Sequence, residues 1–167
     1  MLAAQRMVMH ISVIGSGEAV PARLYELACA CGSLVARAGH VLVCGGRGGI
    51  MEAACKGAHE AGGITVGILP TPDTASANPY VSVAVCTGMG ELRNGIVVAS
   101  GAVVLAFPGS YGTLSELAYA ARWGKDIIVV CKDNFPVPIR DILLTQTVKY
   151  VKNIGEVELA LREYHGF

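Results

Sequence analysis

Three short glycine-rich runs each follow an apolar stretch typical of a β-strand and precede a stretch typical of a helix. The runs are Gly15-Ser16-Gly17, Gly45-Gly46-Arg47-Gly48-Gly49 and Gly109-Ser110-Tyr111-Gly112. Glycine lacks the β-carbon that would keep a phosphate away from the backbone, and a helix that starts at such a turn presents amide N–H donors and the positive end of its dipole. The three turns therefore favour an anion site, with close packing of the turns against their helices as the alternative.

Charged side chains in and near these turns have a structural as well as a chemical interpretation. Arg47 is either a solvated loop residue or the partner of a phosphate or carboxylate. Thr113 and Glu116 match a capping box at a helix start, in which the glutamate only satisfies a backbone N–H. Unless it has a chemical role, Arg93 is a surface charge or a partner for Glu91. Both interpretations stay open for these residues.

Apolar runs and turn residues divide the chain into alternating strands and helices. Strands are predicted over residues 8–14, 41–44, 64–69, 81–85, 102–107 and 127–131, the last being the final core strand. Helices are predicted over residues 23–38, 50–61, 91–100, 113–123 and 139–148, and residues 157–164 close the chain. Continuous apolar strands that alternate with helices indicate a parallel sheet covered on both faces. The predicted fold class is α/β, a Rossmann-like doubly wound parallel sheet sandwiched between helices, whose ligands bind outside the carboxyl ends of the strands.

The bulk composition bounds the kind of partner. The length of 167 residues fits one domain, so we expect a single Rossmann-like nucleotide-binding domain over residues 1–167. Charged residues make up only 16%, against about 25% in an average soluble domain. We therefore expect apolar surface to be buried against a partner, most simply as a homodimer or higher homo-oligomer. Lys plus Arg number 13 and Asp plus Glu 13, which gives no electrostatic footprint for nucleic acid or membrane and favours a small phosphate-bearing ligand.

The mean hydropathy of +0.51 raises the question of a membrane protein. The most apolar stretch, residues 95–107, contains Ser100 and Gly101 and is shorter than the roughly 20 residues needed to span a bilayer. Residues 1–5 are too few for the core of a signal peptide. We therefore expect a cytoplasmic protein.

The six cysteines include no CxxC pair, and several lie in apolar runs. This usage favours reduced cysteine acting as a small hydrophobic residue. Cys55 and His59 stand four residues apart on a predicted helix, a spacing that permits a shared metal ion. Because no second pair of ligands accompanies them, we expect no metal site.

Two motifs together carry a resemblance to a known family. The first signature of the Lonely Guy family of nucleoside-monophosphate phosphoribohydrolases resembles the run Cys44-Gly45-Gly46-Arg47-Gly48-Gly49-Ile50-Met51-Glu52. Its second signature, Pro-Gly-Gly-x-Gly-Thr-x-x-Glu, resembles Pro108-Gly109-Ser110-Tyr111-Gly112-Thr113-Leu114-Ser115-Glu116. The wider superfamily includes DprA-like nucleotide-binding proteins and the molybdenum-cofactor carrier protein, and segments 61–70, 78–81 and 87–89 look closest to a branch near that carrier. Members are often labelled lysine decarboxylase, an activity for which the sequence offers no evident Schiff-base lysine.

The resemblance covers roughly residues 8–131 and implies roles for particular residues. It places the family's catalytic arginine at Arg93, its catalytic glutamate at Glu116 and its phosphate loop over residues 109–113, ending at Thr113. In hydrolysis of an N-glycosidic bond, a carboxylate beneath ribose C1′ stabilises the developing cation or activates water, while the 5′-phosphate anchors the sugar. The resemblance also implies a homodimer formed through the helix that carries Arg93.

Two positions depart from the family pattern. Ser110 replaces the second glycine of the Pro-Gly-Gly run, and Asn94 stands where the enzymes usually carry a lysine. Ligand binding tolerates both changes more easily than catalysis does. Three functions follow: binding of a nucleotide or other phosphate-bearing ligand, nucleoside 5′-monophosphate phosphoribohydrolase activity, and carriage of the molybdenum cofactor. No cofactor is required, and a bound nucleotide or molybdopterin-type molecule is the expected ligand.

Overall fold

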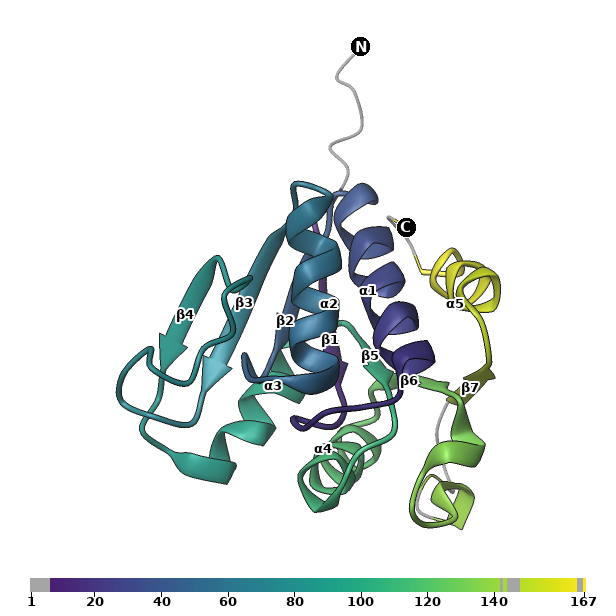
Figure 1. The fold of residues 1–167 in the computed structure, drawn as a ribbon. Helices are drawn as coiled ribbons and strands as arrows, with labels where there is room; N and C mark the ends of the chain where they lie inside the picture. Colours follow the sequence, from purple (N-terminus) through teal and green to yellow (C-terminus); the bar gives the residue numbers. More distant parts are fainter. Residues whose placement is uncertain (1–6, 142, 144–147, 165–166) are drawn as a thin grey trace.

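A computed structural model describes residues 7–141, 143, 148–164 and 167. In this part of the chain, seven parallel strands form one sheet in the order β4-β3-β2-β1-β5-β6-β7 (Figure 1). The strands are β1 (His10–Ile14), β2 (Val41–Cys44), β3 (Ile64–Leu69), β4 (Val83–Cys86), β5 (Val103–Ala106), β6 (Asp126–Val130) and β7 (Val148–Val151). The predicted Rossmann-like α/β fold class is confirmed.

Helices cover both faces of the sheet. The helices are α1 (Ala22–Arg37), α2 (Gly49–Glu60), α3 (Asn94–Ser100), α4 (Tyr111–Arg122) and α5 (Ile154–Leu161), with short 3₁₀ turns η1 (Gly90–Arg93), η2 (Lys132–Asn134) and η3 (Ile139–Asp141). One apolar cluster joins α1, α2 and α5 to one sheet face, and a second joins α3 and α4 to the other. Alternate residues of β5 enter the two clusters, because successive side chains of a strand point to opposite faces.

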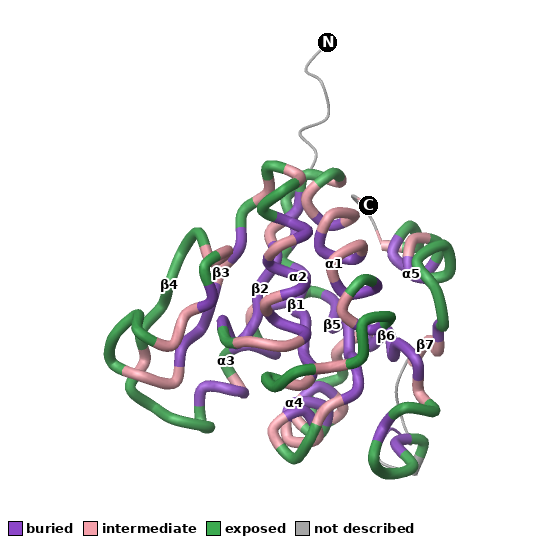
Figure 2. The backbone as a smooth tube through the Cα atoms, in the orientation of Figure 1, coloured by how far each residue is buried: buried purple, intermediate pink, exposed green. Residues whose placement is uncertain are grey.

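Burial follows from this layered arrangement. All four residues of β5 are buried between the layers, whereas all four residues of β4, at the edge of the sheet, are exposed (Figure 2). The continuous apolar sequence of β5 is therefore that of a strand covered on both faces. Within the described part of the chain, no helix is both long and apolar enough to cross a membrane.

The order of the strands fixes where a ligand cavity can form. The chain builds β1 to β4 outward in one direction and then returns to place β5 on the other side of β1. In doubly wound sheets such a reversal opens a crevice at the carboxyl ends of the strands. The three glycine-rich turns follow β1, β2 and β5, which are neighbours in the sheet, so all three lie at this crevice.

The C-terminal part of the sheet was not predicted correctly. Residues 127–131 do not form the last strand, because β7 pairs with β6 beyond it. The helix predicted over residues 139–148 is wrong at both ends, where η3 forms a single turn and Val148 begins a strand; residues 142 and 144–147 lie outside the described part. Ile139 and Leu143 do have the spacing of a helix and are buried in the second cluster. Pairing with β6, which local spacing does not report, makes the next segment a strand.

Candidate functional site

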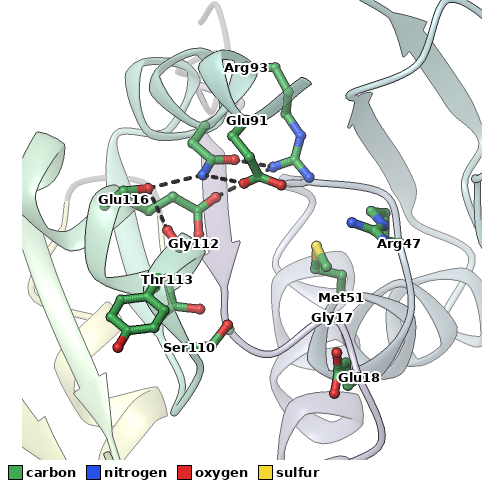
Figure 3. A pocket seen from close by; sticks show the side chains of 14 residues that line it. Gly17, Glu18, Arg47, Met51, Glu91, Arg93, Ser110, Gly112, Thr113 and Glu116 are labelled. Atoms are coloured by element: carbon green, nitrogen blue, oxygen red, sulfur yellow. Dashed lines mark hydrogen bonds and ion pairs between the residues drawn. The ribbon is translucent and has the colours of Figure 1, made fainter. Parts of the chain in front are cut away.

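A cavity of about 480 Å³ opens at the reversal point, at the carboxyl ends of the central strands (Figure 3). Its wall consists of Gly15, Gly17, Glu18, Arg47, Met51, Glu91, Arg93, Asn94, Ser110, Tyr111, Gly112, Thr113, Ser115 and Glu116. These residues come from the turn after β1, the β2–α2 turn with the start of α2, the η1–α3 junction, and the start of α4. Segments far apart in the sequence therefore meet at one site.

The structure separates the predicted site residues into two groups. Those that line the cavity are Gly15, Gly17, Arg47, Arg93, Ser110, Tyr111, Gly112, Thr113 and Glu116. The others lie behind its wall and pack against protein; they are Ser16, Gly45, Gly46, Gly48 and Gly109. Close packing, the alternative interpretation of the glycines, thus describes this second group.

Gly45 makes room for a charged side chain. A β-carbon added to Gly45 would lie 2.7 Å from both terminal nitrogens of the Arg93 guanidinium. Arg93 is the last residue of η1 and is only 5% exposed. The absence of a side chain at residue 45 therefore positions a buried cation at the cavity wall.

The start of α4 is open to the cavity. Ser110 is the N-cap residue, and among the described residues no side chain caps the helix. Leu114 donates its N–H to the carbonyl of Ser110 at 3.1 Å, whereas no described hydrogen bond uses the N–H groups of Tyr111, Gly112 and Thr113. An uncapped first turn whose residues line a cavity is an anion-binding arrangement.

The capping-box interpretation of Thr113 and Glu116 is wrong. Because α4 already begins at Tyr111, both residues lie inside the helix, and the cap position is Ser110. The Glu116 side chain instead lines the cavity and faces Arg93, with 3.7 Å between Oε1 and Nη1. The interpretation of Arg93 as a surface charge is also wrong, because its side chain is buried, as is that of Glu116.

The Arg93 guanidinium is incompletely satisfied. Its Nη1 donates to Asn94 Oδ1 at 2.7 Å, and its Nε has no hydrogen-bond partner among the described residues. The distance to Glu116 Oε1, 3.7 Å, is too long for a hydrogen bond. A buried cation in this condition is stabilised by an anion that supplies the missing acceptors.

The carboxyl group of Glu116 has an altered protonation equilibrium. The pKa of Glu116 is raised from 4.5 to about 8, chiefly because the carboxyl group is buried; Arg93 lowers this pKa, and the charges of Cys44 and Glu91 add to the rise. Burial therefore outweighs the attraction of the guanidinium. At neutral pH the carboxyl group is mostly protonated and can donate a proton into the cavity.

A hydrogen-bonded side chain connects Arg93 to α4. The amide nitrogen of Asn94 donates to Glu91 Oε2 at 3.2 Å and to Ser115 Oγ at 3.0 Å. Ser115 Oγ in turn donates to the carbonyl of Gly112 at 2.7 Å. The position of the guanidinium is thus coupled to the first turn of the helix whose amides face the cavity.

Five further residues of the wall were not predicted as site residues. They are Glu18, Met51, Glu91, Asn94 and Ser115. Glu18 directly follows the first turn, and Ser115 lies inside the second signature, so proximity to the motifs was the available signal. Met51 lies inside the first signature, but its apolar side chain gives no chemical reason to expect it in the wall.

Cys55, one member of the possible metal pair with His59, lies against another cysteine. Cys55 Sγ lies 3.4 Å from Cys44 Sγ, both residues being fully buried. Mutual hydrogen bonding and burial raise the pKa of Cys44, and the same hydrogen bond lowers the pKa of Cys55. In the described residues there is no group of three His, Cys, Asp or Glu side chains that could hold a metal ion.

Comparison with known proteins places these observations in a family context. The model of the SLOG cluster4 family matches residues 8–158. A protein of Archaeoglobus fulgidus described as uncharacterized is 42% identical over 120 residues, which are 72% of this chain and 78% of the relative.

Solved structures share the whole fold. The molybdenum cofactor binding protein of Rippkaea orientalis is 32% identical, with a TM-score of 0.85 over 95% of this chain and 98% of that one. The Moco carrier protein of Chlamydomonas reinhardtii is 30% identical, with a TM-score of 0.83 over 94% and 97% of the two chains. DNA processing protein A of Helicobacter pylori, 19% identical with a TM-score of 0.70 over 94% and 82%, shares the fold alone.

Proposed function

The chain belongs to the SLOG cluster4 family, and on that premise we propose that it binds a small phosphate-bearing molecule in the cavity at the start of α4. The superfamily that the sequence motifs indicated, that of Lonely Guy and DprA-like proteins, is confirmed by this membership. The names of the neighbours, a cofactor binding protein and a cofactor carrier, support a ligand-binding role.

One observation carries the proposal. Arg93 is 5% exposed, lines the cavity, and has an Nε without a hydrogen-bond partner in the described part of the chain. The unused amides of the first turn of α4 line the same cavity. A phosphate bound between them satisfies both sets of donors at once, which neither Glu116 at 3.7 Å nor the neutral Asn94 does.

The remaining wall suits a ligand larger than phosphate itself. A cavity of about 480 Å³ lies within the range of small-molecule sites. Arg47 and Glu18 are exposed side chains on the opposite wall and are available to a second part of the ligand. We propose a nucleotide or a molybdopterin-type molecule, each of which joins a phosphate to a nitrogen heterocycle; for the latter, Arg93 and the α4 amides would hold the phosphate.

Ligand protection against unfolding tests this proposal. We expect AMP, GMP or molybdopterin to raise the melting temperature of the protein, and Arg93→Ala to weaken the binding about 100-fold, because it removes a buried charged donor. Arg162→Ala is a matched control, since Arg162 pairs with Glu158 on α5 and does not line the cavity. If Arg93→Ala and Arg162→Ala bind equally well, the phosphate is not held where we propose.

Phosphoribohydrolase activity is the second candidate, and the position of Glu116 favours it. A protonated carboxyl group in the cavity wall can donate a proton to the base as the bond between its nitrogen and ribose C1′ breaks, while water adds to C1′ and returns a proton to the carboxylate. The test is the release of free base from AMP, CMP, GMP and UMP, followed by chromatography. Glu116→Gln should abolish release and leave ligand protection intact. Protection without any release of base assigns the protein to binding alone.

We also propose that the protein forms a homodimer in the cytoplasm. Leu92, next to Arg93 in η1, is 71% exposed, and Ile96 in α3 is 37% exposed, which gives this region an outward apolar face. All the cysteines are free, as is usual in a reducing compartment. Sedimentation should give a dimer for the natural chain and a shift toward monomer for Leu92→Lys. A natural chain that sediments only as a monomer excludes the dimer.

A further inference from the structure

Asn94 is a buried residue whose side chain makes hydrogen bonds with three other side chains. It is 2% exposed, lies at the junction of η1 and α3, and uses both ends of its carboxamide. Its Oδ1 accepts from Arg93, while its Nδ2 donates to Glu91 and Ser115. The side chain thus joins three elements of the cavity wall.

The surrounding groups fix which way the carboxamide points. The carboxylate of Glu91 is only an acceptor, and the hydroxyl proton of Ser115 is given to the carbonyl of Gly112. Both groups therefore need a donor, so Nδ2 must face them. Oδ1 is left to face Arg93, whose guanidinium is only a donor.

The geometry points to Asn94 as the positioning residue of this site: we propose that its carboxamide holds the Arg93 guanidinium at the cavity and away from a closed ion pair with Glu116. This role rests on the proposed anion site. Arg93 Nη1 lies 2.7 Å from Asn94 Oδ1 but 3.7 Å from Glu116 Oε1, so the neutral oxygen has the hydrogen bond and the carboxyl group does not.

The consequence for ligand binding follows from charge. An amide oxygen orients the guanidinium without cancelling its charge, whereas a carboxylate in hydrogen-bond contact would cancel most of it. Through Ser115, the same amide ties Arg93 to the first turn of α4. The two groups proposed to hold the phosphate are therefore arranged before the ligand arrives, which lowers the cost of ordering them.

The titration of Glu116 reports this arrangement without any ligand. Arg93, Cys44 and Glu91 are the charged or titratable groups that act on its carboxyl group, and only Arg93 lowers its pKa. In Asn94→Ala the guanidinium is free to close on Glu116, so we expect the pKa of Glu116 to fall. In Asn94→Asp the new carboxylate forms an ion pair with the guanidinium and adds negative charge near Glu116, so we expect the pKa of Glu116 to rise.

The experiment is an NMR titration of isotope-labelled glutamate carboxyls, with Glu116→Gln to assign the signal, over a pH range of about 5 to about 10. Shifts of opposite sign in Asn94→Ala and Asn94→Asp support the positioning role, because general loosening of the structure moves both in one direction. An unchanged midpoint in both, or equal shifts in both, overturns it. The affinity of both variants for AMP should also fall by about tenfold or more, since each substitution moves the Arg93 guanidinium away from the cavity.

Two further variants keep the result decisive. Asn153→Ala is the matched control, because Asn153 is the exposed N-cap of α5 and its loss lowers stability without touching the cavity. Ser115→Ala removes one bond that orients Asn94 and leaves the contact with Arg93; it should lower the pKa of Glu116 less than Asn94→Ala does. Where an Asn94 variant fails to fold, Ser115→Ala decides: a lower pKa supports the role and an unchanged one overturns it.

Failure of this inference is distinguishable from failure of the proposed function. If the natural chain binds neither AMP nor inorganic phosphate while the two Asn94 variants shift the Glu116 titration in opposite directions, the anion site is wrong and the positioning of Arg93 stands. If AMP binds and the titration does not respond, the site stands and Asn94 has no positioning role.

Discussion

Two of the glycine-rich turns are alike in sequence and opposite in use. The β2–α2 turn, residues 45–49, is filled by the protein itself, whereas the β5–α4 turn, residues 109–113, opens onto the cavity. Each connects a buried strand to the first turn of a helix at the same edge of the sheet. What differs is whether another segment reaches the helix start.

In the β2–α2 turn, neighbouring segments take up the polar groups. Ile50, in the first turn of α2, donates its N–H to the carbonyl of Ser16 at 2.9 Å. Asn78 donates to the carbonyls of Gly46 and Arg47 at 3.2 and 2.9 Å. This turn therefore serves packing, and Arg47 is its one member among the described residues that line the cavity.

In the β5–α4 turn, only Gly109 is packed in this way, against Ser16 and Thr113, and the residues after it line the cavity. A β-carbon added to Gly112 would have no neighbour nearer than 3.6 Å, and the first amides of α4 are unused within the described residues. The difference teaches that a glycine-rich turn is only permissive. Whether it packs or binds is decided by the segments around it.

The largest effect is expected from filling the packed turn. Gly49 has φ of +61°, and a β-carbon there would overlap the backbone oxygens of Ser16 and Glu18. Gly49→Ala should therefore lower the free energy of unfolding by about 3 kcal/mol or more, measured by urea denaturation. Gly62→Ala is the matched control, because Gly62 has φ of +76° with no neighbour within 4 Å and should lose only about 1 kcal/mol. Equal losses would mean that the packed turn is not tightly filled.

Glu116, in the helix that follows the open turn, should make stability depend on pH. The pKa of Glu116 is about 8 in the folded protein and 4.5 for a freely solvated glutamate, as in the unfolded chain. The contribution of the protonated group to the free energy of unfolding is therefore complete below pH 4.5 and is lost as the pH rises through about 8. Urea denaturation from about pH 5 to about pH 9 should show the free energy of unfolding falling. The fall should be smaller in Glu116→Gln, which stays neutral. An identical slope in the two proteins would contradict the burial of a neutral carboxyl group.

The glycines of the packed turn should affect the ligand through Arg93. The added methyl of Gly45→Ala would lie 2.7 Å from the guanidinium nitrogens and displace them. The protein should still fold, because the displaced group is the end of a flexible side chain, but AMP affinity should fall about tenfold. Isothermal titration calorimetry checks this, with Gly62→Ala as the control. If Gly45→Ala binds AMP as tightly as the natural chain does, the space at residue 45 has no influence on the ligand site.

The smallest effect is expected from filling the open turn. Gly112→Ala has space for its methyl group, so the free energy of unfolding should stay within about 0.5 kcal/mol of that of the natural chain. Its methyl group enters the cavity, and AMP affinity should fall about threefold to tenfold. Thermal unfolding with and without AMP measures both quantities. A loss of stability comparable to that of Gly49→Ala would remove the contrast between the turns.

Much of the fold could be predicted from the sequence because its signals are local. The strands β1, β2, β3, β5 and β6 lie within or close to the predicted ranges, since buried parallel strands are continuous apolar runs. β7 was missed because Lys149 and Tyr150 give it a mixed pattern and its pairing partner is distant in sequence. The start of α4 was placed two residues late, at Thr113 and not at Tyr111, because Ser110 caps it through the backbone alone.

The candidate site was predictable where the motif residues themselves form the wall. Arg93, Glu116 and residues 110–113 of the β5–α4 turn line the cavity. Gly45 was assigned to the ligand because composition does not report what fills a turn, and the structure gives its space to Arg93. The role of Asn94 depends on three contacts, two with η1 and one with α4, and none of these contacts is visible in the sequence.

The sequence by itself determined the doubly wound sheet and the edge at which its glycine-rich turns gather, because both follow from the alternation of apolar strands with helices. Only the tertiary structure decided which turn is filled and which is open, and how the buried guanidinium of Arg93 lies relative to the buried carboxyl group of Glu116. The physical reason is that burial and hydrogen-bond geometry depend on the distances between segments that are remote along the chain. Those distances set the strength of every interaction at the site.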